Sequence, residues 1–213
     1  MATRLEWLDD HPSIREPEPF AGSDHPMRKV TRRVAFEQQW DERNATNVGA
    51  LFDGLAEGWS QRADQDGRIA SIADALDRGG APLDGAWLEL GSGTGMGTAI
   101  ARERIESLVA ADLSWEMLVR APAELAPRLR ADAARLPFCN DQFDGLLLVN
   151  MLLFPGEVDR VLRADGALVW VNTVGAQTPI HLPPEDVLEA LPGEWRGRAG
   201  RAGTGIWLVA TRA

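Results

Sequence analysis

The sequence predicts an α/β fold built on a doubly wound sheet that is mostly parallel, has an antiparallel C-terminal strand and carries helices on both faces. Beyond residue 80, short apolar runs alternate with segments of helical periodicity. One of these runs, Trp87–Leu90, leads directly into a turn in which every second residue is glycine. With 213 residues, of which 45% are hydrophobic, the chain is long enough for one domain with a sizeable core.

The N-terminal part predicts an arm followed by helices. Residues 1–28 combine four prolines with many charges, so we expect a flexible arm there, which Trp7 and Phe20 could attach to the body. Residues 29–80 show helical spacing, and a second amphipathic stretch ends at Gly79-Gly80. At least two helices should therefore precede the glycine turn. One expected apolar stripe consists of Val48, Leu51, Phe52, Leu55 and Trp59.

The remaining chain predicts six strands with helices between them. The apolar run Leu146–Val149 is typical of a central strand that is buried on both faces. The expected strands are Ala86–Leu90, Ser107–Ala111, Arg128–Ala131, Phe143–Asn150, Ala167–Thr173 and Gly205–Thr211. The expected helices are Met96–Arg104, Ser114–Arg120, Gly156–Arg163 and Pro184–Leu191. Residues 194–213 predict a terminal antiparallel hairpin, turned by residues 200–205.

The glycine turn predicts a site for a nucleotide-like ligand. Glycine has no Cβ and tolerates a positive φ, so a ligand can lie directly against the backbone amides. The dinucleotide fingerprint requires glycines at the first, third and sixth positions. Counting from Gly91 the sixth position is Met96, and counting from Gly93 it is Thr98. The pattern is instead an acid, Glu89, followed by glycines at 91, 93 and 95.

Acidic residues follow the next two expected strands. Ligands of open parallel sheets bind at the carboxyl ends of the strands, where Asp112 is placed to accept hydrogen bonds from both hydroxyls of a ribose. The alternative is that Asp112 only caps the helix near Ser114. Asp132 can accept from an adenine amino group, and the Ala133 amide can donate to the neighbouring ring nitrogen.

These motifs together resemble the class I S-adenosylmethionine-dependent methyltransferases, and specifically the small-molecule enzymes called type 11. The resemblance covers residues 87–174 and includes the stretch Asp132-Ala133-x-x-Leu136-Pro137-Phe138. It implies a Rossmann-like core over residues 81–213 and a single methyltransferase domain over residues 29–213, with residues 29–80 capping the site. It also implies S-adenosyl-L-methionine as cofactor. The implied cofactor-binding residues are Glu89, Gly91, Ser92, Gly93, Gly95, Asp112, Leu113, Asp132, Ala133 and Asn150.

No catalytic residue is evident, because attack on a sulfonium methyl needs alignment more than a dedicated nucleophile. A general base is required only if the acceptor must lose a proton. His181 is the one candidate, since it follows the fifth expected strand of the core, although a packing role on a long loop is the favoured interpretation. Phe52 and Trp59 share a helix face and could cover the cofactor or the acceptor.

Composition favours a small-molecule partner. The net charge of −10 argues against nucleic acid or an anionic membrane as the main partner, and the single Cys139 excludes an internal disulfide and a cysteine-rich metal site. Without a signal-peptide pattern, we expect a cytoplasmic protein. A methyltransferase acting on a small molecule is the leading hypothesis. The alternatives are an NAD-dependent oxidoreductase and a non-catalytic protein that binds S-adenosylmethionine.

Overall fold

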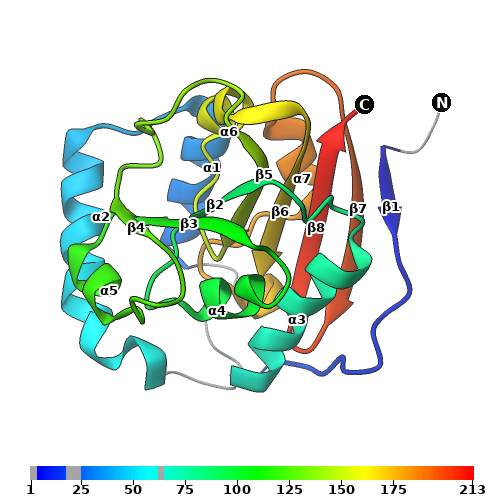
Figure 1. The fold of residues 1–213 in the computed structure, drawn as a ribbon, viewed down its shortest axis with the longest axis horizontal. Coiled ribbons are helices and arrows are strands. Elements are labelled where there is room, and N and C mark those ends of the chain that lie inside the picture. The colour runs from blue at the N-terminus through cyan, green and yellow to red at the C-terminus, as the bar shows by residue number, and fades with distance from the viewer. Residues whose placement is uncertain (1–3, 18–24, 62–64) are drawn as a thin grey trace.

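The computed structural model describes residues 4–17, 25–61 and 65–213, and its centre is an eight-stranded sheet (Figure 1). The strand order is β1-β7-β8-β6-β5-β2-β3-β4. Only β8 runs antiparallel to its neighbours, so the prediction of a mostly parallel sheet with an antiparallel C-terminal strand is confirmed. The strands are β1 Leu5–Trp7, β2 Ala86–Leu90, β3 Ser107–Asp112, β4 Arg128–Arg130, β5 Phe143–Val149, β6 Leu162–Asn172, β7 Trp195–Ala202 and β8 Gly205–Arg212.

Helices cover both faces of this sheet, as predicted. Residues of α6 and α7 pack with Leu88 and Leu146 on one face. Residues of α3 and α4 pack with Trp87 and Leu147 on the other. Side chains alternate in this way because neighbouring residues of a strand point to opposite faces. The α-helices are α1 Met27–Glu37, α2 Glu42–Leu55, α3 Gln65–Arg78, α4 Met96–Arg102, α5 Trp115–Arg120, α6 Pro155–Val161 and α7 Pro184–Ala190, with 3-10 turns η1 Ala56–Gln61 and η2 Gly175–Gln177.

Strand β5 is the centre of the core. It pairs with β2 on one side and β6 on the other, and Leu146, Leu147 and Leu148 are fully buried. The apolar run therefore forms the doubly covered strand that the sequence predicted. Its partner β6 starts earlier than expected, at Leu162, because the helix before it ends at Val161.

The N-terminal segment differs from the expected arm. Leu5–Trp7 form β1, which pairs in parallel with β7 at the edge of the sheet (Figure 1). The pairing continues beyond the strand, since the amides of Leu8 and His11 donate to the carbonyls of Ala199 and Arg201. The expectation of a flexible arm was therefore wrong for this part, because backbone pairing compensates for its few apolar residues. Trp7 contacts the body as expected, whereas Phe20 lies outside the described residues.

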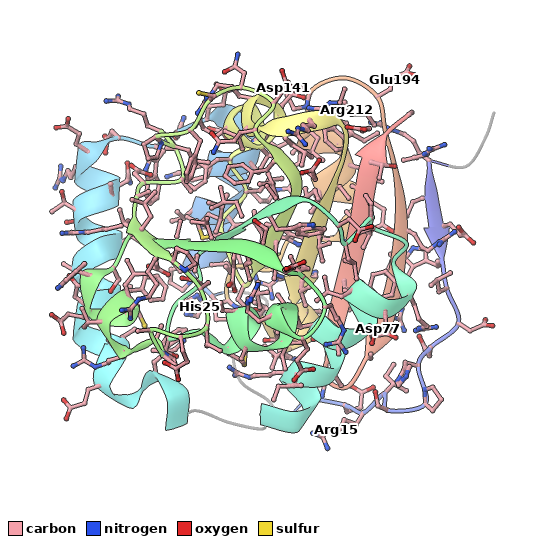
Figure 2. The ribbon with its side chains drawn as sticks, in the orientation of Figure 1. Arg15, His25, Asp77, Asp141, Glu194 and Arg212 are labelled. Carbon is pink, nitrogen blue, oxygen red and sulfur yellow. The ribbon has the colours of Figure 1, made fainter. Side chains whose placement is uncertain are left out.

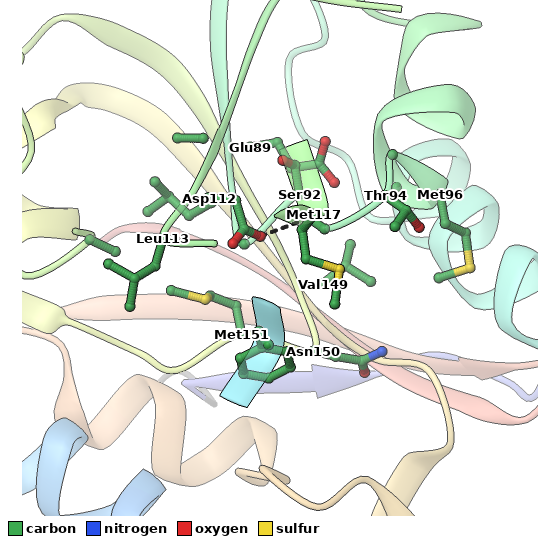
Figure 3. Close-up of a pocket in the computed structure, with 18 of the residues that line it drawn as sticks. Glu89, Ser92, Thr94, Met96, Asp112, Leu113, Met117, Val149, Asn150 and Met151 are labelled. Atoms are coloured by element: carbon green, nitrogen blue, oxygen red, sulfur yellow. Dashed lines mark hydrogen bonds between the residues drawn. The ribbon is translucent and has the colours of Figure 1, made fainter. Parts of the chain in front are cut away.

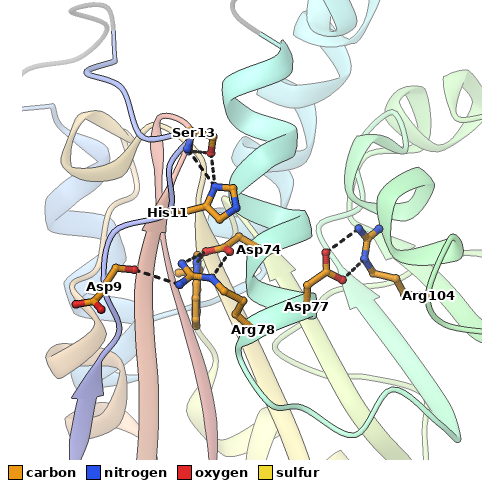
Figure 4. Close-up of polar contacts among 9 residues, drawn as sticks. Asp9, His11, Ser13, Asp74, Asp77, Arg78 and Arg104 are labelled. Atoms are coloured by element: carbon orange, nitrogen blue, oxygen red, sulfur yellow. Dashed lines mark hydrogen bonds and ion pairs between the residues drawn. The ribbon is translucent and has the colours of Figure 1, made fainter.

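Helix α3 connects the N-terminal segment to one face of the sheet. Asp74 on this helix is buried and accepts from Trp207 Nε1 on β8 at 2.7 Å. Arg78, one turn later, pairs with Asp74 and also donates to the carbonyl of Asp9 (Figure 4). The helix thus packs on the sheet and fastens the N-terminal segment, in addition to contributing residues near the site.

Charged side chains lie mainly around the outside of this framework (Figure 2). Arg212, near the end of β8, donates to the Asp159 carboxylate at 2.9 Å and to main-chain carbonyls around α6. In the described part of the chain, no helix is long and apolar enough to cross a membrane.

Residues 25–61, which include α1, α2 and η1 and which we call the cap, contribute side chains near the carboxyl ends of the strands. Asp41 begins α2 with a capping box, in which its carboxylate accepts from the Asn44 amide at 2.8 Å. The apolar stripe expected on this helix is only partly buried. Leu51 is 51% exposed, so neighbouring elements cover only part of the expected stripe. Its helix contacts the rest of the molecule through a narrower face that includes the buried Gly49.

Candidate functional site

A cavity of about 410 Å³ lies at the carboxyl ends of β2, β3 and β5, beneath the cap (Figure 3). Its lining comes from the loops that follow the strands and from residues of α1, α2 and η1. The structure brings together at this cavity all ten residues for which the sequence implied a cofactor role. They are Glu89, Gly91, Ser92, Gly93, Gly95, Asp112, Leu113, Asp132, Ala133 and Asn150.

The glycine turn is fixed by hydrogen bonds to the neighbouring strand. The amides of Gly91 and Ser92 both donate to the carbonyl of Ala111, at 2.8 and 3.1 Å. Gly91 and Gly95 have φ values of 71° and 92°, in the left-handed region that favours glycine. Gly95 also precedes the first residue of α4, so the turn and the helix N-terminus face the cavity together.

Glu89 is a buried acid at the end of β2, with a side chain that is 1% exposed. Its carboxylate accepts from Thr98 Oγ1 on α4 at 2.5 Å. Burial raises the pKa of Glu89 to about 8, against the opposing effect of the Thr98 hydrogen bond. A Cβ at position 97 would lie 2.3 Å from Glu89 Oε1, so glycine there provides the space for this carboxylate.

Asp112 connects the glycine turn to the end of β3. One carboxylate oxygen accepts from the Gly93 amide at 2.8 Å (Figure 3). The other oxygen accepts from the Ser114 amide, also at 2.8 Å. Burial raises the pKa of Asp112, and these amide hydrogen bonds oppose the shift. The cap of α5 is Ser114 itself, whose hydroxyl accepts from the Met117 amide. Asp112 faces the cavity and retains unused lone pairs.

Asp132 follows β4 and is held by two donors. Its carboxylate accepts from the Ala134 amide at 2.9 Å and from the indole Nε1 of Trp40, which lies between α1 and α2. Ala133 is buried and lines the same part of the cavity. The indole contact is one that sequence reasoning missed, because its partners are 92 residues apart.

Asn150 lies immediately after β5 with φ of 49°, a conformation that asparagine tolerates better than most residues. Its side-chain amide donates to Thr173 Oγ1 at 2.8 Å and its Oδ1 accepts from the Thr173 amide at 2.9 Å. It lines the cavity, and these two bonds fix its orientation.

His181 lies on the loop before α7 and is not among the described residues that line the cavity, although its neighbour Ile180 is. Its Nδ1 is 2.9 Å from Asn172 Oδ1. Burial, together with the nearby positive charge of Arg28, lowers the pKa of His181 to about 4. The ring is therefore neutral near pH 7, and its contacts favour the packing role over that of a general base.

Apolar side chains line the rest of the cavity. Four of the chain's five methionines are among them, together with aromatic side chains from the cap. Phe52 and Trp59 meet edge to face at 5.5 Å. These two were anticipated from helical spacing, whereas the methionines carry no local signal that distinguishes them from core residues. The methionines and further apolar residues at this wall are Met27, Met96, Met117, Met151, Trp40, Val48, Leu152, Phe154 and Ile180.

The site fits a cofactor that carries both polar and apolar groups. The Ser92 hydroxyl is buried in the glycine turn and has no hydrogen-bond partner among the described residues. A buried hydroxyl of this kind is costly unless another group satisfies it. The glycine amides, Asp112 and Asp132 supply further polar positions around the same space. This arrangement suits the ribose and amino acid portions of S-adenosylmethionine.

Comparisons with known proteins agree with this geometry. Residues 88–170 match the family described as "Methyltransferase domain". The demethylmenaquinone methyltransferase of Mycolicibacterium paratuberculosis is 30% identical over 144 residues, which are 60% of this chain and 60% of that protein. The match therefore spans less than two thirds of the relative's length.

Solved structures share the fold. The DhpI–SAH complex has a TM-score of 0.65 at 16% identity, and the comparison covers 79% of this chain and 97% of that chain. A possible histamine N-methyltransferase from Thermotoga maritima has a TM-score of 0.60 at 16% identity, covering 77% and 99%. The family match over residues 88–170 and this shared fold are consistent with a class I S-adenosylmethionine-dependent methyltransferase, a family whose cofactor is S-adenosyl-L-methionine.

Proposed function

We propose that the protein transfers the methyl group of S-adenosylmethionine to a small apolar acceptor. The observation that carries this proposal is the composition of the cavity. Its lining combines glycine amides and the two aspartates that follow β3 and β4 with methionine and aromatic side chains. A cofactor and an apolar acceptor would thus share one space, as an in-line transfer requires.

Each polar residue has a place in this proposal. Asp112 holds the ribose hydroxyls, Asp132 and the Ala133 amide frame the adenine, and the turn over residues 91–95 lies against the methionyl part. Leu113 packs near the adenine, and Asn150 orients the methionyl end. When bound, the cofactor supplies a methyl group on a sulfonium, which is already an activated leaving group. The cap excludes water from the reacting groups and aligns the acceptor.

The acceptor is inferred from the methionine and aromatic side chains that line the cavity. Methionine side chains are flexible and polarisable, so they adapt to apolar and aromatic ligands, including ligands of irregular shape. The curated relatives are named for demethylmenaquinone. An uncharged, ring-containing acceptor of that general kind suits the methionines and aromatic rings of this chain. Because Cys139 is free and exposed, a reducing compartment such as the cytoplasm is part of the proposal.

Calorimetry tests the cofactor. We expect the protein to bind S-adenosylmethionine and S-adenosylhomocysteine and to bind NAD much more weakly. Preferential binding of NAD would reject the proposal in favour of an oxidoreductase.

Methyl incorporation tests the activity. Cofactor labelled in its methyl group, incubated with a panel of hydroquinones, phenols, amines and thiols, should give a labelled apolar product. Labelling of charged acceptors alone would contradict the assignment of the apolar wall. Tight cofactor binding without any transfer, across this panel and an extract of apolar metabolites, would favour a non-catalytic binding protein.

A further inference from the structure

Trp40 occupies a connection whose main chain is fixed on both sides. Helix α1 ends at Gln38, which has a left-handed φ of 53° and donates its amide to the Arg33 carbonyl. Helix α2 begins at Asp41 with its capping box. The amide of Trp40 itself donates to the Gln38 carbonyl at 3.0 Å. Little freedom is left for the indole, so its direction is set by the ends of two helices.

The indole points at the Asp132 carboxylate. Nε1 lies 3.1 Å from Oδ1 and 3.0 Å from Oδ2, so it bridges both oxygens, and the Ala134 amide reaches Oδ1 from the main chain. Hydrogen bonds to an ionised carboxylate are stronger than those between neutral groups. Two donors from different segments therefore fix the plane of this carboxylate while leaving it other lone pairs.

The Trp40 ring also packs against Phe154, another residue that lines the cavity. Trp40 meets Phe154 edge to face, with ring centroids 5.3 Å apart, and both side chains line the cavity. Phe154 lies just before α6, at the end of the loop that follows β5. Trp40 is outside the 88–170 segment that matches the family, whereas Asp132 is inside it. The indole of Trp40 thus connects a residue outside the matched segment to a carboxylate inside it.

We propose that Trp40 is a positioning residue that sets the selectivity of Asp132 for the adenine amino group. The inference rests on the proposed function, because Asp132 recognises adenine only if the cofactor binds here. An oriented carboxylate accepts from an amino group and repels a carbonyl oxygen at the same place. Without the indole N–H, the carboxylate can rotate, and this discrimination should weaken.

The test compares S-adenosylhomocysteine with S-inosylhomocysteine, in which a carbonyl oxygen replaces the amino group. Calorimetry on the wild type should show a preference for the adenosyl compound. Trp40→Phe keeps an aromatic ring against Phe154 and removes the donor. It should weaken adenosyl binding about tenfold and reduce the preference by a similar factor. Trp115→Phe, on a side chain that is 54% exposed, is the matched control and should change neither value.

Two further variants separate the N–H from packing. Phe154→Leu removes the ring contact and retains the indole donor, so the preference should survive. Asp132→Ala should remove the part of the preference that depends on the amino group, and adding Trp40→Phe to it should reduce the preference no further. The part that remains comes from the Ala133 amide, which would face a ring N–H in the inosyl compound. A Trp40→Phe protein that retains the full preference would overturn the inference, as would loss of the preference in Phe154→Leu. A wild type that binds neither compound would instead reject the proposed function.

Discussion

Loops at the strand ends and helices of the cap line the same cavity, but they are built from different groups. At the strand ends, main-chain amides and buried carboxylates dominate, and glycine conformations such as that of Gly91 are required. In the cap, apolar side chains dominate, and Gly49 is the one buried residue of α2. The family match includes the first region and excludes the second. The two regions of one cavity therefore differ in the groups that build them and in whether the family match includes them.

The largest expected effect is on cofactor affinity at the strand ends. Asp112→Ala removes the acceptor proposed for two ribose hydroxyls, each contributing about 1.5–3 kcal/mol as a hydrogen bond to a charged group. We expect affinity for S-adenosylhomocysteine to fall about 100-fold or more, measured by calorimetry. Asp77→Ala, which breaks an outer ion pair with Arg104 (Figure 4), is the control and should leave affinity unchanged. Equal affinity in both variants would remove Asp112 from the site.

The second prediction contrasts one glycine from each region. Gly97→Ala places a methyl group 2.3 Å from the buried Glu89 carboxylate and should lower the free energy of unfolding by about 1–3 kcal/mol. Gly54→Ala meets no atom within 4 Å on the cap and should raise it by about 0.5–1 kcal/mol. Urea denaturation measures both. Changes of the same sign would contradict the difference in packing between the two regions.

The third prediction concerns pH and the buried acid. Because the folded pKa of Glu89 is raised to about 8, the native state retains a proton that the unfolded state releases, so stability falls as pH rises toward 8. His181 has the opposite sign, with stability lost below pH 6.5 as its unfolded form gains a proton. Well above pH 6.5 the His181 effect ends, whereas the Glu89 effect continues toward pH 8.

Glu89→Gln isolates this effect. Between pH 6.5 and 8, the unfolding free energy of the wild type should decline relative to the variant by up to about 1.4 kcal/mol per pH unit. Chemical denaturation at several pH values measures the difference. Parallel pH curves for the two proteins would show that Glu89 is ionised throughout this range.

The smallest effect is expected in the cap. Phe52→Leu removes the edge contact with Trp59 and should lower the free energy of unfolding by about 0.5–1.5 kcal/mol. Affinity for S-adenosylhomocysteine should stay within about twofold, because other groups hold the cofactor. Phe36→Leu, on the outer face of α1, serves as the control. A loss of cofactor affinity comparable with that of Asp112→Ala would show that the cap contributes to cofactor binding as much as the strand ends do.

Local patterns explain which parts of the fold could be predicted from sequence. The apolar runs of β2 and β5, the glycine turn and the terminal hairpin are contiguous, and each forms where expected. The acids after β3 and β4 were found because parallel strands end at one edge of a sheet. Helical spacing identified the apolar stripe that contains Leu51, but spacing does not show how much of a stripe a neighbour covers, and Leu51 is 51% exposed.

The parts that escaped prediction depend on residues distant in sequence. Trp40 has no local mark that relates it to Asp132, and the methionines of the cavity resemble ordinary core residues until the cap is in place. The segment containing β1 was read as an arm, since its composition lacks the apolar content of a strand. The segment forms a strand because it pairs with β7, which is distant in the sequence.

That pairing has a consequence for how the molecule assembles. Leu5 lies opposite Gly197, and Trp7 lies opposite Ala199, so 192 residues separate the partners. During synthesis, the hydrogen bonds of β1 cannot form until the segment that contains β7 has emerged. Docking of β1 is therefore a late event, and protection of its amides from hydrogen exchange would mark molecules whose C-terminal hairpin is already in place.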